Sequence, residues 1–213
     1  MKMIFSLAVV FSWLAAIAVA SEFEGTVHMN LTAGKNTHQI TYTIKGSKLR
    51  FDQQIAKGPT SAGLFDVATG EITVLMPEQK MYLTMGAPKV GLGADTKIEE
   101  TGRTETIAGY PCSEIIVRDK KHVIEVWTTE ALGKMPNLAE AFGNRGRRSA
   151  WENYAADKGL FALRVITRDR KGKERSRLEC TEVKREDVAD DLFAIPEAYT
   201  QLKMPGLGDL FGT

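Results

Sequence analysis

Residues 63–85 read Gly63-Leu64-Phe65-Asp66-Val67-Ala68-Thr69-Gly70-Glu71-Ile72-Thr73-Val74-Leu75-Met76-Pro77-Glu78-Gln79-Lys80-Met81-Tyr82-Leu83-Thr84-Met85. Apolar and β-branched side chains form three runs, which are interrupted at Thr69-Gly70 and again at Pro77-Glu78-Gln79. Gly70 provides the backbone freedom that a hairpin turn needs, and Pro77 removes a ladder donor where a strand ends. The pattern predicts three short antiparallel strands joined by tight turns.

The same β pattern extends toward the N-terminus, as far as residue 23. Apolar and polar residues alternate along 23–32, 39–45 and 48–52, with turns at 33–36 and 46–47. Period two over such lengths is typical of strands with one buried and one solvated face. The expected buried positions are Phe23, Val27, Met29, Leu31, Ile40, Tyr42, Ile44, Leu49 and Phe51.

Further strands are expected at 104–107, 112–117, 123–128, 160–168 and 174–184, and a loop at 86–95. The strand at 160–168 alternates, with Phe161, Leu163 and Val165 on one face. Before it, residues 129–157 have helical character, with a possible N-cap at Thr129 and a capping box that begins at Ser149. Residues 185–193 predict a helical turn. The chain is therefore expected to be mainly β, with a helical insert at about 129–157.

Residues 1–20 carry the marks of a secretory signal: a basic start, an apolar middle and the small-residue site Ala18-Val19-Ala20. A membrane anchor is the alternative, because about 18 apolar residues can just span a bilayer. Cleavage after Ala20 would leave a soluble periplasmic or secreted protein without stable membrane insertion. It would comprise one domain, residues 21–203, and a flexible Gly-rich tail, residues 204–213, although Leu207, Leu210 and Phe211 in that tail could also dock.

The charge balance and the two cysteines indicate which partners and which compartment suit the protein. The leader holds one Lys and no acid, so the remainder carries 27 basic and 27 acidic side chains. This balance gives no general attraction to nucleic acid. Cys112 and Cys180 are expected to form a disulfide in an oxidising compartment, and the alternative is two small buried thiols.

Residues with catalytic or metal-binding patterns are not found in the sequence. His28, His38 and His122 lack ligand spacing, and neither GxSxG nor a phosphate-binding glycine motif occurs. The expectation is therefore a protein that is not an enzyme and has no metal or cofactor. Arg145, Arg147 and Arg148 could meet a lipid head group or an acidic partner, or form a solvated loop.

Methionines form the remaining candidate pattern. The side chain adapts to varied apolar ligands, although it also fills cores. Five of the methionines fall within the expected strands and insert, at Met29, Met76, Met81, Met85 and Met135.

Five short motifs occur in order along nearly the whole chain: residues 45–51 (KGSKLRF), 74–82 (VLMPEQKMY), 107–112 (IAGYPC), 126–128 (VWT) and 191–199 (DLFAIPEAY). In this order they resemble a domain-of-unknown-function family of exported bacterial proteins. That family is similar in fold to the periplasmic lipoprotein carrier LolA and its receptor LolB. The resemblance implies a strongly bent antiparallel sheet, an unclosed half-barrel, with a few short helices covering its concave face.

The resemblance also implies a binding function. The lipoprotein carriers hold acyl chains between sheet and helices, and Lys45, ahead of Gly46, could take the place of a basic residue in their pattern. The first hypothesis is a periplasmic binding protein for a lipid, acyl chain or other apolar ligand. The alternative is a non-catalytic envelope protein with a packed core and a protein partner. The expected ligand-binding residues are Lys45, Phe51, Met76, Met81, Leu138, Phe142 and Trp151.

Overall fold

The structure is a computed structural model that describes residues 23–54, 60–66, 69, 71–86, 97–118, 122–134 and 150–202. Its elements are the strands β1 Glu24–Ala33, β2 Asn36–Lys45, β3 Lys48–Gln54, β4 Thr60–Asp66, β5 Glu71–Met76, β6 Met81–Gly86, β7 Lys97–Ile107, β8 Tyr110–Arg118, β9 His122–Thr129, β10 Phe161–Asp169, β11 Glu174–Arg185 and β12 Thr200–Gln201, the helix α2 Ala150–Asp157 and the 3-10 turn η1 Asp190–Phe193.

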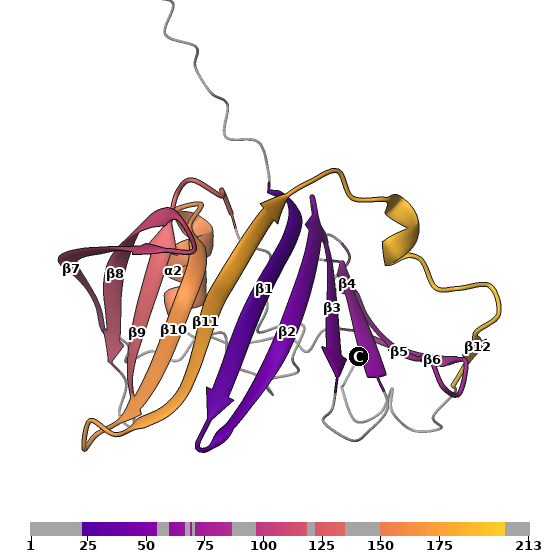
Figure 1. Cartoon of the computed structure of the whole chain (residues 1–213), viewed down its shortest axis with the longest axis horizontal. Coiled ribbons are helices and arrows are strands. Elements are labelled where there is room, and N and C mark those ends of the chain that lie inside the picture. Colours follow the sequence, from indigo (N-terminus) through magenta and orange to yellow (C-terminus); the bar gives the residue numbers. More distant parts are fainter. Residues whose placement is uncertain are drawn as a thin grey trace, which may run out of the picture.

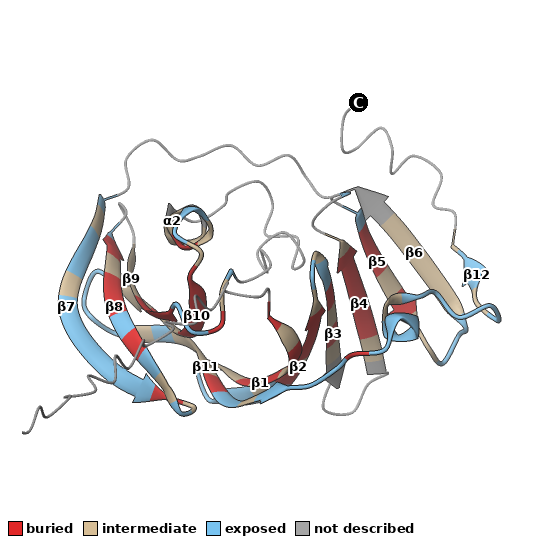
Figure 2. Ribbon diagram, turned by 90° about the horizontal axis from the view of Figure 1, so that it is seen from above, coloured by how far each residue is buried: buried red, intermediate tan, exposed pale blue. Residues whose placement is uncertain are grey.

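The twelve strands described form one sheet in the order β12-β6-β5-β4-β3-β2-β1-β11-β10-β9-β8-β7. Neighbours pair antiparallel, except that β12 runs parallel to β6. The sheet bends strongly without closing on itself (Figures 1 and 2). The expected fold class, a mainly β half-barrel, is confirmed, and the stretch 63–85 contains the end of β4, all of β5 and most of β6, which pair antiparallel as predicted.

Strand register identifies the concave, inner face, because directly opposed residues point to the same side. One row of cross-strand partners is Ile115, Val126, Val165, Leu178 and Leu31. A second row is Val27, Tyr42, Phe51, Gly63, Val74 and Leu83. Both rows are apolar, and the large side chains at their centre pack into the main core. The expected alternation in β1 to β3 is therefore confirmed.

Helix α2 lies inside the curve of the sheet (Figure 2). Trp151 and Tyr154 pack there against a cluster that contains Ile115, Val126 and Ala162 from β8, β9 and β10. The capping-box prediction of a short helix near Trp151 is confirmed. Residues 135–149, which contain the first expected helix, lie outside the described residues.

Two local predictions were wrong. Phe161 and Val165 do not share a face, because a β-bulge between Ala162 and Arg164 shifts the register on β9. Phe161 opposes Thr129, whereas Val165 opposes Val126 on the face under α2, and Leu163 lies in the bulge. Thr129 is also not a helix N-cap. It ends β9 and accepts a hydrogen bond from the Ala131 backbone N–H at 3.3 Å within a turn.

Residues 186–199 follow β11 and form a segment that we call the strap. It runs along the outside of the bent sheet, includes η1 and leads into β12 (Figure 2). The helical turn expected at 185–193 is thus shorter, at Asp190–Phe193. The leader, residues 87–96 and the tail from 203 lie outside the described residues.

Candidate functional site

The inner face of β5 and β6 carries apolar side chains that stay half-exposed. Met76 and Met81 are cross-strand partners at the turn, and Val74 and Leu83 are partners two residues further along. All four are half-buried, unlike Ile72 on the same face. We call these four residues the lip, because they lie in the last hairpin before the short β12 at one edge of the half-barrel (Figure 2). The structure thus brings the predicted residues Met76 and Met81 together.

Phe51 lies deeper, on the inner face of β3, and is 9% exposed. Its ring covers Gly63 on β4, where an added Cβ would come within 1.9 Å of Phe51 Cε1. Gly63 is therefore required by the position of the Phe51 ring. This predicted residue belongs to the core that supports the inner face.

Lys45 lies on the opposite, outer face. Its ammonium donates to the Val188 carbonyl at 2.7 Å and pairs with Asp190 at 3.2 Å and Glu24 at 3.6 Å. The hydrogen bond with Asp190 raises the pKa of Lys45 above its ordinary value. In this structure Lys45 fastens the strap, and it does not share a site with Phe51.

Trp151 packs on the inner face through α2, in the arm formed by β8, β9 and β10. The helix is fixed at its C-terminal end, where Lys158 Nζ donates to Glu100 Oε1 at 2.7 Å and the Tyr154 hydroxyl donates to the same oxygen. The Lys158 hydrogen bond lowers the pKa of Glu100. The other two predicted residues of the insert, Leu138 and Phe142, lie outside the described residues.

The predicted disulfide is absent, and Cys112 and Cys180 are buried free thiols. Each thiol donates to a nearby carbonyl at 3.4 Å, Cys112 to Tyr110 and Cys180 to Glu182. The strands that carry them, β8 and β11, are separated in the sheet by β9 and β10. Burial raises the pKa of both thiols, that of Cys180 to about 11. The alternative expectation, two buried thiols, describes the structure.

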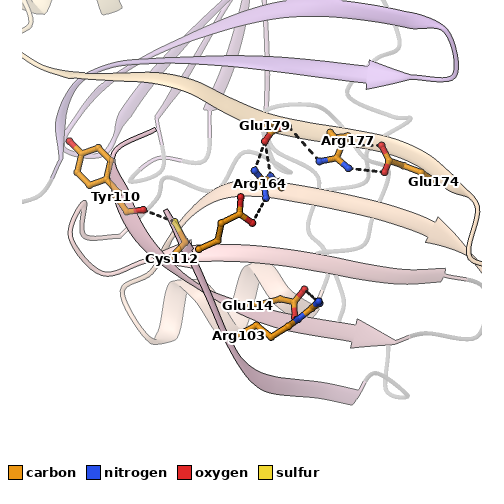
Figure 3. Close-up of polar contacts among 9 residues, drawn as sticks. Arg103, Tyr110, Cys112, Glu114, Arg164, Glu174, Arg177 and Glu179 are labelled. Carbon is orange, nitrogen blue, oxygen red and sulfur yellow. Dashed lines mark hydrogen bonds and ion pairs between the residues drawn. The ribbon is translucent and has the colours of Figure 1, made fainter. Parts of the chain in front are cut away.

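A second cluster, on the outer face, was not anticipated (Figure 3). Glu114 is 1% exposed, yet its carboxylate accepts from Arg103 Nε at 2.5 Å, from Arg103 Nη2 and from the Thr101 hydroxyl at 2.7 Å. Glu114 opposes Trp127 on β9, and the guanidinium groups of Arg103 and Arg164 lie 5.8 and 5.9 Å from the Trp127 ring centroid.

Arg164 extends this cluster across β10 to β11. It donates to Glu105 at 2.7 Å and to Glu179 at 2.8 Å, and Arg177 pairs with Glu179 and Glu174 at 3.5 and 2.9 Å (Figure 3). Every charged group named here has an opposite partner. The cluster can therefore hold strands β7 to β11 in register.

Metal ligands and membrane spans were sought in the same residues. Within the described ranges, no three His, Cys, Asp or Glu side chains gather in a way that could bind a metal ion. None of the helices in those ranges has the length and apolar character to cross a bilayer.

The open, bent sheet with an apolar inner face defines a half-barrel of antiparallel strands. Residues 23–199 match a family described as a domain of unknown function, DUF4412, and the chain belongs to this family. Among curated proteins none matches the sequence.

Solved structures share the fold at low sequence identity. An uncharacterized conserved protein from Thermus thermophilus aligns over 86% of this chain and 91% of its own, with 11% identity and a TM-score of 0.52. PNGF-II aligns over 87% of this chain with 16% identity and a TM-score of 0.50, and this chain spans only 32% of its length. A putative outer membrane lipoprotein-sorting protein domain from Vibrio parahaemolyticus has 10% identity over 79% of this chain and 87% of its own, and its TM-score of 0.26 is too low to establish a common fold.

Proposed function

We propose that the protein is an exported, non-catalytic binding protein that holds a lipid, an acyl chain or another apolar ligand against the inner face of its half-barrel. The observation that carries the proposal is the lip. Val74, Met76, Met81 and Leu83 point to the apolar face of an unclosed sheet and remain half-exposed. Removing apolar surface from water contributes roughly 25 cal/mol of favourable free energy per Å². An alkyl chain that covers these residues is therefore bound without any polar contact.

The side chains of the lip suit a ligand of variable shape. Met76 and Met81 are unbranched thioethers, which repack around different apolar partners more readily than branched residues do. Behind them, Phe51 and the rest of the inner face form a packed core that holds the lip in place. The apolar leader at residues 1–20 supports an envelope location, where lipids and acylated proteins are the abundant apolar ligands.

The test uses the mature chain from Ser21 onward and a fluorescent fatty acid, cis-parinaric acid. We expect saturable binding, and the double variant Met76→Gln, Met81→Gln should weaken it about tenfold, because two apolar contacts worth about 0.7 kcal/mol each are lost. Leu192→Gln with Ile195→Gln is the matched control on the outer face and should leave the fatty-acid affinity unchanged.

Organic extraction of protein purified from its native compartment, followed by lipid mass spectrometry, complements this assay. A lipid that copurifies with the native chain and is reduced in the Met76→Gln, Met81→Gln variant would support the proposal. Absence of both copurified lipid and parinaric acid binding in a folded protein would reject it.

A further inference from the structure

The strap is fastened at both ends and spans the outer face between them. Near its start, Val188 is buried, its N–H donates to Glu24 Oε1 at 2.8 Å and its carbonyl accepts from Lys45. At its end, Tyr199 packs against Ala62, Leu64 and Leu75, and the Thr200 N–H donates to the Lys80 carbonyl at 2.9 Å. In the middle, Arg50 Nη1 donates to the Leu192 carbonyl at 3.0 Å.

A groove of about 230 Å³ lies between the strap and the outer face of β3, β4 and β5. Its apolar walls include Leu64 from the sheet and Phe193 and Ile195 from the strap. Its polar rim holds Lys48, Asp66 and Glu71. This volume is smaller than that of a typical small-molecule site, which is about 300 Å³ or more, and it accommodates one or two side chains of a peptide.

Exposed apolar residues gather beside this groove. In the described part of the chain, the large hydrophobic side chains that are exposed are Leu192, at 41%, and Ile195, at 36%, and both belong to the strap. The fastened backbone holds both side chains toward solvent. An apolar patch with a polar rim is typical of an interaction surface.

The charge of the surroundings identifies the kind of partner. From residue 186 to residue 199 the strap contains five acids and no Lys or Arg: Glu186, Asp187, Asp190, Asp191 and Glu197. All five are exposed. Lys45 pairs with Asp190, and Arg50 is occupied by Asp52 at 2.8 Å. On the groove rim, Lys48 is outnumbered by Asp66 and Glu71. A surface with this excess of acid repels anionic lipid head groups and attracts a cationic partner.

We propose that the groove and the strap form a second binding site, on the face opposite the lip, for a basic, apolar peptide segment of a partner protein. One or two apolar side chains of the segment fill the groove beside Phe193 and Ile195. Its Lys or Arg residues lie against Asp191, Glu71 and Glu197. The site is independent of the inner-face ligand, since no residue of the lip contributes to it.

The test is fluorescence anisotropy with the mature chain and a labelled eight-residue peptide of alternating Lys and Leu. We expect binding that weakens as salt rises from 50 to 300 mM, because exposed charges are screened over about 10 Å. Leu192→Gln with Ile195→Gln should weaken it about tenfold, and Asp191→Asn with Glu197→Gln should weaken it and flatten its salt dependence. Both pairs are exposed, so folding should be intact and is checked by thermal unfolding. Met76→Gln with Met81→Gln is the control and should bind the peptide normally.

Three results of the peptide assay would overturn the proposal. They are the absence of peptide binding by the folded chain, equal binding of the peptide with Glu in place of Lys, and unchanged affinity in both strap variants. Binding of the Leu192→Gln, Ile195→Gln variant to phosphatidylglycerol vesicles more weakly than the parent chain would also overturn it, because these side chains would then serve a membrane. Neither assay depends on fatty-acid binding, so the two sites can fail separately.

Discussion

Gly63 tests at single-residue resolution how tightly the inner face is packed. Gly63→Ala places a methyl group where the Phe51 ring lies, and the ring is enclosed by the core. Overpacking of this kind costs about 1–3 kcal/mol. Urea unfolding should show a lower midpoint with an unchanged m-value.

The pairing of Gly63 with Phe51 supplies its own control. In the double variant Gly63→Ala, Phe51→Leu, the smaller side chain at position 51 leaves room for the methyl group. The double variant should therefore lose less stability than the sum of the losses measured for the two single variants. Strictly additive losses would contradict the contact.

Glu114 tests the outer cluster. The carboxylate is buried and accepts three hydrogen bonds, whereas Arg103 is largely exposed. Glu114→Gln removes the charge from a buried, charge-assisted pair and should lower the free energy of unfolding by about 2 kcal/mol. Glu105→Gln is the comparison, since its carboxylate is more exposed and its pair with Arg164 is screened by solvent, so the loss of stability should be clearly smaller. Equal losses would show that burial of Glu114 does not matter.

The burial of Cys112 and Cys180 predicts how fast the two thiols react with iodoacetamide. At pH 8 both should stay protonated in the native protein, because burial raises their pKa, that of Cys180 to about 11. Only the thiolate reacts with iodoacetamide, so labelling should be much slower than for free cysteine and complete at two thiols in urea without reductant. Finding no free thiol in urea would show that the bridge forms after all.

At the scale of elements, the ion pairs of Glu100, Glu105 and Glu174 predict that the strands and the helix they join are sensitive to acid. The pKa of Glu100, Glu105 and Glu174 is lowered, in each case chiefly by a hydrogen bond from Lys158, Arg164 or Arg177. A carboxylate with a lowered folded pKa stabilises the native state above its unfolded pKa of about 4.3, and this stabilisation is lost as pH falls through the folded value.

Amide hydrogen exchange between pH 6 and pH 3 should therefore show β7, α2 and β11 losing protection before β2 and β3 do, after correction for the intrinsic rate. Loss of protection in both regions at the same pH would contradict this assignment.

The strands were predictable because their signals are local. Alternation in 23–51 and the two turns in 63–85 fix β1 to β6 to within a few residues. The bulge in β10 was not predictable, because it depends on how Ala162 and Arg164 register on β9. The two-residue β12 was missed for a related reason: its pairing with β6 bridges more than a hundred residues.

The candidate site was predictable only in part. Met76 and Met81 flank a turn and meet across one hairpin, so their proximity follows from the sequence. Lys45 was assigned through a resemblance, and its position on the outer face follows from strand parity, since it alternates with Ile44. The cluster of Arg103, Glu114 and Arg164 joins the β7–β8 hairpin to β10, which lies much later in the chain, and only tertiary structure shows that Arg164 meets the other two.

At the scale of the whole molecule, the bent sheet separates two surfaces. The inner face is apolar and ends in the half-exposed lip, whereas the outer face carries the charged cluster and the strap. The family and the solved structures establish the fold, and what the protein binds follows from these surfaces as a proposal.

Methyl NMR of the mature chain labelled with 13C at the methionine methyl groups tests the inner-face proposal most directly. On titration with oleate, the resonances of Met76 and Met81 should shift together and saturate, while that of Met29, enclosed in the core, should change little. Resonances of Met76 and Met81 that remain unmoved at saturating oleate would contradict the account.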